Sequence, residues 1–135
     1  MFNGVLFTVF LILLVGCTTA ALNSHYEDSE VVILNKDNFD KRVVKSDYAW
    51  LVLFYDLYCG HCQDFAPEYK KLAAELAGRV EIGSLECGNS NRPLKNFYGV
   101  TRFPTMKLLW AKEPIDIYGT TSDAIIVELK KYIDF

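Results

Sequence analysis

The feature that most constrains this chain is the run Trp50–Tyr55 (WLVLFY), in which every residue is apolar or aromatic. An uninterrupted run of this kind is typical of a central strand that is buried on both faces of a sheet. Phe65, Tyr69 and Leu72 then lie on one stripe at helical spacing and predict a helix, and Gly78 supplies its end. The architecture to expect is therefore a sheet with helices packed against it.

Further segments predict more strands and helices in an alternating order. Asn35 or Asp37 can cap a helix near the start of the domain, and Ser122 or Asp123 can cap the last helix. The order β-α-β-α-β-α-β-β-α predicts an α/β fold with a mixed sheet in one domain. The other predicted strands cover residues 31–34, 80–85, 105–110 and 115–118, and the other predicted helices lie within residues 35–46, 89–98 and 122–135.

The first 26 residues contain no Lys, Arg, Asp or Glu. Residues 5–15 are apolar with one exception, which is shorter than the roughly 20 residues that span a bilayer. Small residues follow at 16–21, as signal peptidase requires. We therefore predict a secretory signal peptide over residues 1–21 and a flexible polar lead over residues 22–30.

Two alternatives attach the N-terminal segment to a membrane. An uncleaved signal anchor is one, and the other is a bacterial lipoprotein box that places a lipid on Cys17. Otherwise the expected location is the secretory pathway, either the lumen of the endoplasmic reticulum or outside the cell. Residues 131–135 contain no retrieval signal of the Lys-Asp-Glu-Leu type, so both destinations stay open.

The motif Cys59-Gly60-His61-Cys62 lies where the predicted central strand leads into a helix. A thiol at a helix N-terminus faces unpaired amide groups and the positive end of the helix dipole, and both favour the thiolate. Two intervening residues bring the second sulfur within reach of the first. We predict that Cys59 is the nucleophile and Cys62 the resolving thiol, while Gly60 relaxes the turn and His61 adds positive charge.

A zinc site and a permanent structural disulfide are two other roles that such a cysteine pair can have. A zinc site needs four ligands, usually from two such pairs, and beyond the motif the chain offers only Cys17, Cys87 and His25. A permanent structural disulfide does not require a position between a strand and a helix. No metal and no bound organic cofactor is expected. The net charge of −3 argues against nucleic acid as a partner.

Four segments together resemble the catalytic domain of protein disulfide isomerases, which has a thioredoxin fold. The resemblance extends over about residues 31–133 and implies a thioredoxin-like domain at 31–135, in which a mixed central β-sheet is flanked by helices on both faces. The four segments are residues 51–55 (LVLFY), 59–62 (CGHC), 65–69 (FAPEY) and 102–105 (RFPT).

The resemblance also implies roles for residues outside the motif. Pro104 matches the cis-proline that lies against the active-site sulfurs in this family. The backbone of Arg102 and Phe103 is then expected to pair with an extended substrate peptide. Tyr58, directly before the motif, joins them as an expected substrate-binding residue. Cys87 matches a cysteine of several family members and is interpreted as a small buried side chain.

Three departures from the family affect the resolving thiol. Leu53 stands where the family has a buried Glu that accepts the proton of Cys62, and residues 119–122 lack the family's mobile Arg. Asp56 stands where the family is apolar. Its carboxylate either weakens Cys59 as a nucleophile or acts as a proton relay for Cys62.

The expected function is that of a thiol–disulfide oxidoreductase, an enzyme that forms, breaks or rearranges disulfides in secretory-pathway proteins. Its substrates would be cysteine-containing proteins or peptides, and glutathione or a thiol oxidase would recharge the cysteine pair. A monomer is expected. One alternative is a peptide-binding, chaperone-like module with weak redox activity, and another is a membrane-anchored bacterial thioredoxin-like lipoprotein.

Overall fold

The structure is a computed structural model and describes residues 24–110 and 112–135. The predicted signal peptide at 1–21 and the candidate lipidation site Cys17 lie outside the described residues. Among the helices of the described ranges, none combines the length and the apolar character that a membrane span requires.

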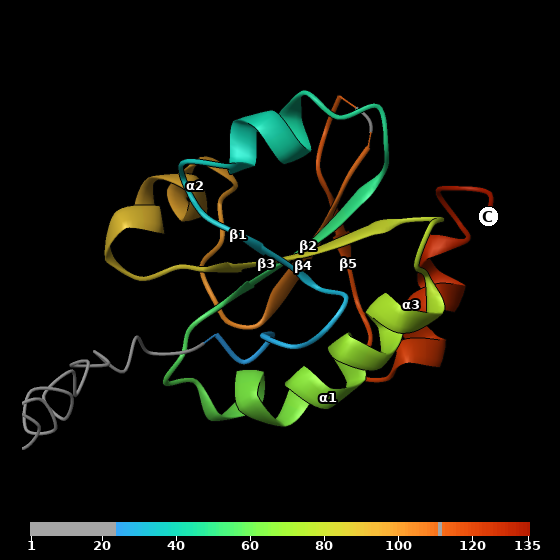
Figure 1. The fold of residues 1–135 in the computed structure, drawn as a ribbon, viewed down its shortest axis with the longest axis horizontal. Coiled ribbons are helices and arrows are strands. Elements are labelled where there is room, and N and C mark those ends of the chain that lie inside the picture. Colours follow the sequence, from blue (N-terminus) through green and yellow to red (C-terminus); the bar gives the residue numbers. More distant parts are fainter. Residues whose placement is uncertain (1–23, 111) are drawn as a thin grey trace, which may run out of the picture.

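Five strands form a mixed sheet in the order β1-β3-β2-β4-β5 (Figure 1). The first three strands run parallel to one another, β4 runs antiparallel to β2, and β5 runs antiparallel to β4. The central position of β2 is the one that its apolar sequence predicted. The strands are β1 (Val32–Leu34), β2 (Trp50–Tyr55), β3 (Glu81–Glu86), β4 (Thr105–Leu109) and β5 (Ile115–Ile117).

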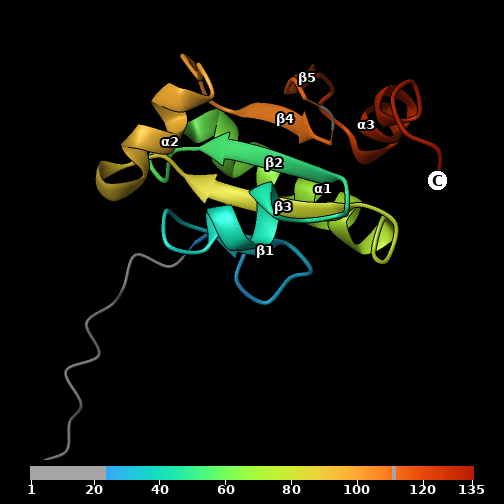
Figure 2. The ribbon, with the colours of Figure 1, turned by 90° about the horizontal axis from the view of Figure 1, so that it is seen from above.

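Helices cover both faces of the sheet (Figures 1 and 2). One face carries α1 and α3, while the other carries α2 and a short turn of π-helix. This arrangement confirms the predicted thioredoxin-like architecture. The helical segments are α1 (Gly60–Glu75), α2 (Arg92–Phe97), α3 (Ser122–Leu129), the π-helical turn (Asp40–Val44) and a 3₁₀ turn (Asn89–Asn91).

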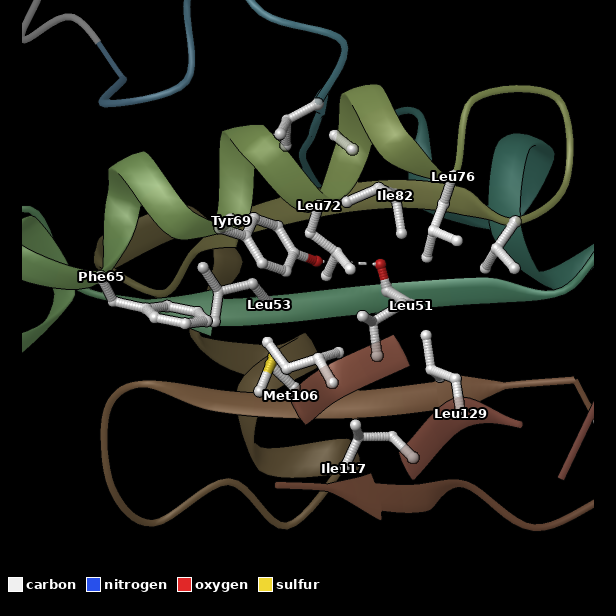
Figure 3. Packing of buried hydrophobic residues seen from close by; sticks show 14 of the residues in the cluster. Leu51, Leu53, Phe65, Tyr69, Leu72, Leu76, Ile82, Met106, Ile117 and Leu129 are labelled. Atoms are coloured by element: carbon white, nitrogen blue, oxygen red, sulfur yellow. Dashed lines mark hydrogen bonds between the residues drawn. The ribbon is translucent and has the colours of Figure 1, made fainter. Parts of the chain in front are cut away.

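All six residues of β2 are buried because the strand contributes to two cores. Leu51, Leu53 and Tyr55 pack in the core beneath α1 and α3, where Figure 3 shows Leu53 beside Phe65 and Tyr69 of α1 and Leu51 on the side of Leu129 of α3. The even-numbered residues pack in the second core with Phe39 and Val43. The strand therefore needs no polar side chain on either face.

Gly83 in β3 allows close packing between the strands beside it. Its Cα is in register with those of Val32 and Val52. A Cβ at this position would lie 2.6 Å from Leu34 Cδ1 and 3.2 Å from Trp50 Cζ3. The missing side chain thus leaves the space that these two large side chains occupy.

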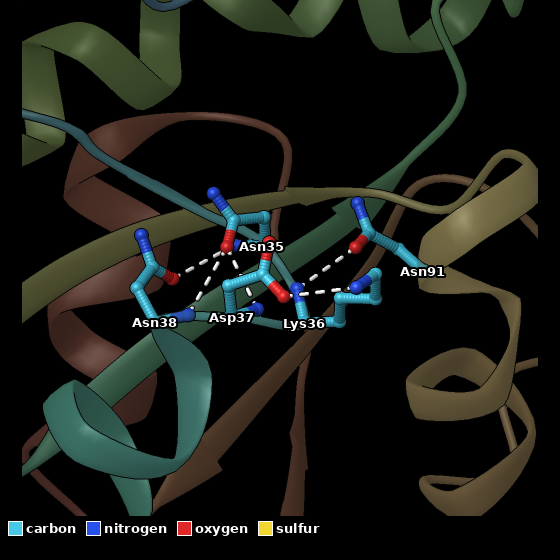
Figure 4. Close-up of polar contacts among 5 residues, drawn as sticks. All are labelled: Asn35, Lys36, Asp37, Asn38 and Asn91. Atoms are coloured by element: carbon cyan, nitrogen blue, oxygen red, sulfur yellow. Dashed lines mark hydrogen bonds and ion pairs between the residues drawn. The ribbon is translucent and has the colours of Figure 1, made fainter.

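Two helix starts differ from the prediction. Within residues 35–46 only Asp40–Val44 is helical, because Asn35 organises a turn instead: its Oδ1 accepts the N–H groups of Asp37 (2.9 Å) and Asn38 (3.0 Å) (Figure 4). An Asn side chain competes with a helix in this way by offering the backbone a local acceptor.

The cap of the last helix lies one residue before Ser122 and two before Asp123, the two predicted caps. Thr121 is the N-cap, and its side-chain oxygen accepts the N–H of Ala124 at 3.3 Å. Ser122 is the first helical residue, and its N–H donates to Glu68 Oε2 at 2.9 Å. This bond ties the start of α3 to α1 and so holds the two helices of that face together.

The lead before the first strand packs against the core, although the sequence predicted it to be flexible. Residues 24–30 form turns, and Tyr26 is only 1 % exposed. The Tyr26 ring packs edge-on against Tyr55 and Tyr69, with ring centres 5.2 Å and 5.7 Å away. The polar neighbours of Tyr26 gave no sign of this burial, which depends on contacts with β2 and α1.

Candidate active site

Cys59 is the N-cap of α1, directly after the turn that follows β2. It is partly exposed, and its Sγ accepts the backbone N–H of Cys62 at 3.4 Å. A sulfur in this position faces the positive end of the helix and a free amide donor, so negative charge on it is stabilised. The fold therefore gives Cys59 the surroundings of a nucleophile.

Cys62 lies one helical turn further along α1 and is fully buried. Both sulfurs are thiols in this structure. Burial is the main reason that the pKa of Cys62 rises to about 12, and its hydrogen bond with Cys59 adds to the effect. At neutral pH Cys62 is therefore a protonated thiol behind the more accessible one.

The loop before β4 brings a second backbone segment to the sulfurs. The Phe103–Pro104 peptide bond is cis, and the Cys59 thiol lies 3.9 Å from the carbonyl oxygen of Phe103, to which it donates. Residues that are 44 positions apart in the sequence are thus in contact at the site. The Phe103 carbonyl group is therefore part of the immediate surroundings of Cys59 Sγ.

The thioredoxin family model matches residues 30–133, most of the described chain. The chain belongs to the thioredoxin family. The fold, the cysteine pair at the start of α1 and the cis peptide bond near it all lie within the matched residues.

Curated relatives of this thioredoxin domain include two protein disulfide isomerases. The protein disulfide-isomerase A6 homolog of Drosophila melanogaster is 39 % identical over 130 residues, which are 90 % of this chain and 30 % of that protein. Human protein disulfide-isomerase A6 is 41 % identical over 118 residues, 84 % of this chain and 27 % of the human protein. The chain thus spans less than a third of the curated relatives it matches.

Solved structures of thioredoxin domains share the fold. The J-Trx1 fragment of ERdj5 superposes with a TM-score of 0.73 at 28 % identity, covering 80 % of this chain and 54 % of the fragment. The first thioredoxin domain of mouse protein disulfide-isomerase A4 gives a TM-score of 0.66 at 32 % identity, covering 76 % of this chain and 74 % of the mouse structure.

The surroundings of Cys62 in this thioredoxin domain are apolar on the side of the sheet. Leu53 is completely buried in the same core as Cys62, at the place where the resemblance implied a proton-accepting Glu. A leucine cannot accept a proton or a hydrogen bond, so it adds to the desolvation that disfavours the thiolate. The departure noted in the sequence thus lies directly in the core behind the motif.

Asp56 contacts the turn that leads to the motif. Its Oδ1 accepts the N–H of Tyr58 at 2.8 Å, and its backbone carbonyl accepts the N–H of Cys59 at 3.2 Å. A hydrogen bond with the Asp56 backbone lowers the pKa of Cys62, whereas the charge of its carboxylate raises it. The contacts give Asp56 a role in shaping the turn, and the proton relay stays a prediction.

A groove of about 840 Å³ lies beside the motif. It brings together three predicted site residues, His61, Arg102 and Pro104. The side chain of Tyr58 is 77 % exposed and is not part of this groove. The predicted substrate-binding residues therefore divide between the groove and the open surface before α1.

Sequence reasoning missed the far wall of this groove, to which Tyr118 and Gly119 contribute. It also missed Lys95, whose ammonium group lies 5.6 Å from the centre of the Phe103 ring. These residues come from separate elements, and no local pattern links them to the cysteine motif. Only the tertiary fold places them near it.

Cys87 is buried in the core on the other face of the sheet. Its thiol donates to the carbonyl oxygen of Leu85 at 3.4 Å, and burial raises its pKa to about 12, with a further contribution from the charge of Glu86. These contacts are those of a small packed side chain, which agrees with the interpretation of Cys87 from the sequence. Within residues 24–110 and 112–135, no group of three or more His, Cys, Asp or Glu side chains is arranged to hold a metal ion.

Proposed function

We propose that this thioredoxin domain is a thiol–disulfide oxidoreductase of the protein disulfide isomerase type. The observation that carries the proposal is the pairing of an accessible Cys59 at a helix N-terminus with a buried Cys62 one turn behind it. The relatives that share 39–41 % of their matched residues with it are named protein disulfide isomerases. Both observations support the same chemistry.

The proposed reaction begins with the thiolate of Cys59. It attacks one sulfur of a substrate disulfide, forms a mixed disulfide and releases the other substrate sulfur as a thiolate. Cys62 then loses its proton to solvent and attacks Cys59 Sγ, which forms the Cys59–Cys62 disulfide and releases the second substrate thiolate. In the opposite direction the oxidised pair transfers its disulfide to a substrate dithiol.

Substrate positioning is proposed to involve Arg102, Phe103 and Pro104. The Phe103 carbonyl lies beside Cys59 Sγ, so an extended peptide there can pair with this backbone by strand addition. Tyr58 offers an exposed ring outside the groove, and His61 lines the groove beside the motif. Gly60 follows the nucleophile as the first residue of α1 and gives the substrate sulfur a clear approach, since nothing lies within 4 Å of where its Cβ would be.

The proposed substrates are cysteine-containing proteins or peptides of the secretory pathway, and glutathione or a thiol oxidase would restore the oxidised pair. The uncharged N-terminal segment and the names of the relatives support a location in the lumen of the endoplasmic reticulum or secretion. We propose that the domain acts as a monomer without a bound cofactor.

A second candidate is a peptide-binding module with weak redox activity. Leu53 and the high pKa of Cys62 favour it, because both slow the release of a mixed disulfide. Incubation of residues 22–135 with an unfolded, disulfide-containing protein separates the two functions. If the domain is an oxidoreductase, its Cys62→Ser variant accumulates a mixed-disulfide complex that a reducing agent cleaves. A binding module gives complexes that resist reducing agent and do not need Cys59.

A further inference from the structure

The Tyr26 hydroxyl is a buried polar group that has no role in the reaction steps proposed above. It has no hydrogen-bond partner among the residues that the structure describes. A buried hydroxyl without a partner lowers stability, since it has lost its contacts with water. Such a hydroxyl can donate a hydrogen bond to a negative charge that forms beside it.

Contacts on both sides hold Tyr26 between the end of β2 and α1, the two elements that flank the motif. The ring packs edge-on against Tyr55 at the end of β2 and against Tyr69 in α1. The neighbouring residues hold the segment in place, because Ser24 Oγ and Tyr55 Oη are hydrogen-bonded at 3.0 Å and His25 Nε2 lies 3.2 Å from the carbonyl oxygen of Leu57. The lead is thus anchored on the strand end and on the turn that precedes Cys59.

Tyr26 and Cys62 belong to the same buried core, together with Leu53. Burial raises the pKa of Tyr26 and of Tyr55, and charge on Cys62 adds a smaller contribution to each. Both tyrosines therefore remain protonated donors throughout the pH range in which the enzyme would work.

The other groups that act on Cys62 favour its protonated form. Cys59 raises its pKa through a hydrogen bond and through charge, and the Asp56 carboxylate raises it through charge. The backbone of Asp56 is the one contribution that lowers it. On the β2 side Leu53 offers no polar atom, and the Tyr55 hydroxyl is already paired with Ser24. The Tyr26 hydroxyl, in contrast, has no hydrogen-bond partner among the described residues.

We propose that the Tyr26 hydroxyl is the hydrogen-bond donor that stabilises the Cys62 thiolate while the mixed disulfide is resolved. The inference rests on the proposed oxidoreductase function. The proton of Cys62 goes to solvent, and Tyr26 keeps its own proton and donates a hydrogen bond to the sulfur. Since the bond forms only with the charged sulfur, it favours the reacting state over the resting thiol. The Tyr26 hydrogen bond thus favours formation of the Cys62 thiolate, which Leu53 cannot do.

The test is a single-turnover experiment on residues 22–135. The reduced protein is mixed with excess oxidised glutathione, quenched with acid and analysed by mass, so that formation and resolution of the glutathione mixed disulfide are followed separately between pH 6.5 and 9.5. We expect Tyr26→Phe to slow resolution about tenfold at each pH, because hydrogen bonds to charged groups have effects of this order. The plot of log rate against pH then moves by about one unit to higher pH, and the rate of formation stays the same.

Tyr69→Phe is the matched control. It also removes one buried hydroxyl, but that hydroxyl donates to the carbonyl oxygens of Leu51 (3.1 Å) and Gly83 (2.8 Å). It should lower the melting temperature and leave the pH profile of resolution in place. Replacement of Tyr26 by 3,5-difluorotyrosine, a stronger donor that keeps the ring and the hydroxyl, should move the profile in the opposite direction.

The outcomes separate the two proposals. An unchanged resolution profile in Tyr26→Phe, or an equal displacement in Tyr69→Phe, overturns the role of Tyr26 and leaves the oxidoreductase function intact. Failure of the unaltered domain to form any glutathione mixed disulfide overturns the function itself. If Tyr26→Phe does not fold, a profile that does not move with difluorotyrosine overturns the inference.

Discussion

The two faces of the sheet each bury one thiol, and the two thiols differ in what surrounds them. Burial raises the pKa of both Cys62 and Cys87 to about 12. Cys62 has a second sulfur one helical turn away, at a helix N-terminus, whereas Cys87 donates to the carbonyl oxygen of Leu85. Burial alone therefore does not make a cysteine redox-active. A partner sulfur at a helix N-terminus distinguishes the face that we propose to be reactive from the packed one.

Replacing each thiol in turn should give the largest difference between the faces. Cys62→Ser should abolish multiple turnover in a refolding assay with reduced and scrambled ribonuclease, since mixed disulfides can no longer be resolved from within. Cys87→Ser should leave turnover unchanged and lower the free energy of unfolding by about 1–3 kcal/mol, because it places a hydroxyl in an apolar core. Equal losses of turnover in the two variants would contradict the comparison.

The pH dependence should be the next largest effect. Resolution by Cys62 is expected to speed up about tenfold per pH unit between pH 6.5 and 9.5, because the thiolate fraction grows by that factor below a pKa of about 12. Stability should change in the opposite direction. Both buried thiols keep their protons in the folded state, so stability is full below about pH 9, where unfolded thiols begin to ionise, and falls from there toward pH 12.

Two measurements check these expectations. Acid-quenched resolution rates across the pH range test the first, and a plateau below pH 9 would contradict a strongly raised pKa of Cys62. Urea unfolding at pH 8 and pH 10 tests the second. In Cys87→Ala the alkaline loss of stability should be smaller than in the unaltered domain, since one of the two buried thiols no longer contributes.

A carboxylate at position 53 should sharpen the difference between the two faces. Leu53→Glu is expected to speed resolution at pH 7 about tenfold, since it places a proton acceptor behind Cys62. This is somewhat less than the usual effect of a general acid or base. The same change should lower stability, because the carboxyl group is buried among apolar side chains. Leu53→Gln is the control, with a similar shape and no proton acceptor, and an equal gain there would refute the explanation.

The smallest expected effect concerns Asp56. If its carboxylate relays the proton of Cys62, Asp56→Asn should slow resolution at pH 7 by about twofold to tenfold, a small effect for an acid–base group. Asn keeps the acceptor for the Tyr58 N–H, so the turn before Cys59 is preserved. Single-turnover release of glutathione measures the change. A rate that is unchanged or higher would leave Asp56 with its structural contact alone.

The sequence predicted the parts of this molecule that depend on short-range patterns. The bounds of β2 are those of its apolar run, and the cysteine motif lies at the start of α1. Both features could be predicted because a buried strand and a strand–helix junction depend on short stretches of sequence. The predicted start of α3 was wrong by one or two residues, since Thr121, Ser122 and Asp123 are adjacent residues that can all cap a helix. Nothing in the local pattern chooses among them.

The parts that were missed depend on tertiary contacts. Tyr26 lies among polar residues in the sequence, and only packing on Tyr55 and Tyr69 buries it. The groove wall formed by Tyr118 and Gly119 approaches the motif because β5 is placed beside β4, a pairing that the sequence predicted as a hairpin but without its position relative to α1. Local chemistry predicted which sulfurs react, and the three-dimensional fold adds the surroundings of those sulfurs.

Gly83 has a consequence for where the reactive sulfur lies. A strand that is apolar on both faces can slip by one residue without exposing an apolar side chain, so the pattern of β2 does not determine its own alignment. The space above Gly83 receives the side chains of Leu34 and Trp50, and a strand shifted by one residue would offer it a different side chain. Cys59 follows the end of β2 by four residues, so its distance to Phe103 depends on this alignment. The absence of a side chain at position 83 thus helps to fix the alignment of β2 and, through it, the position of Cys59.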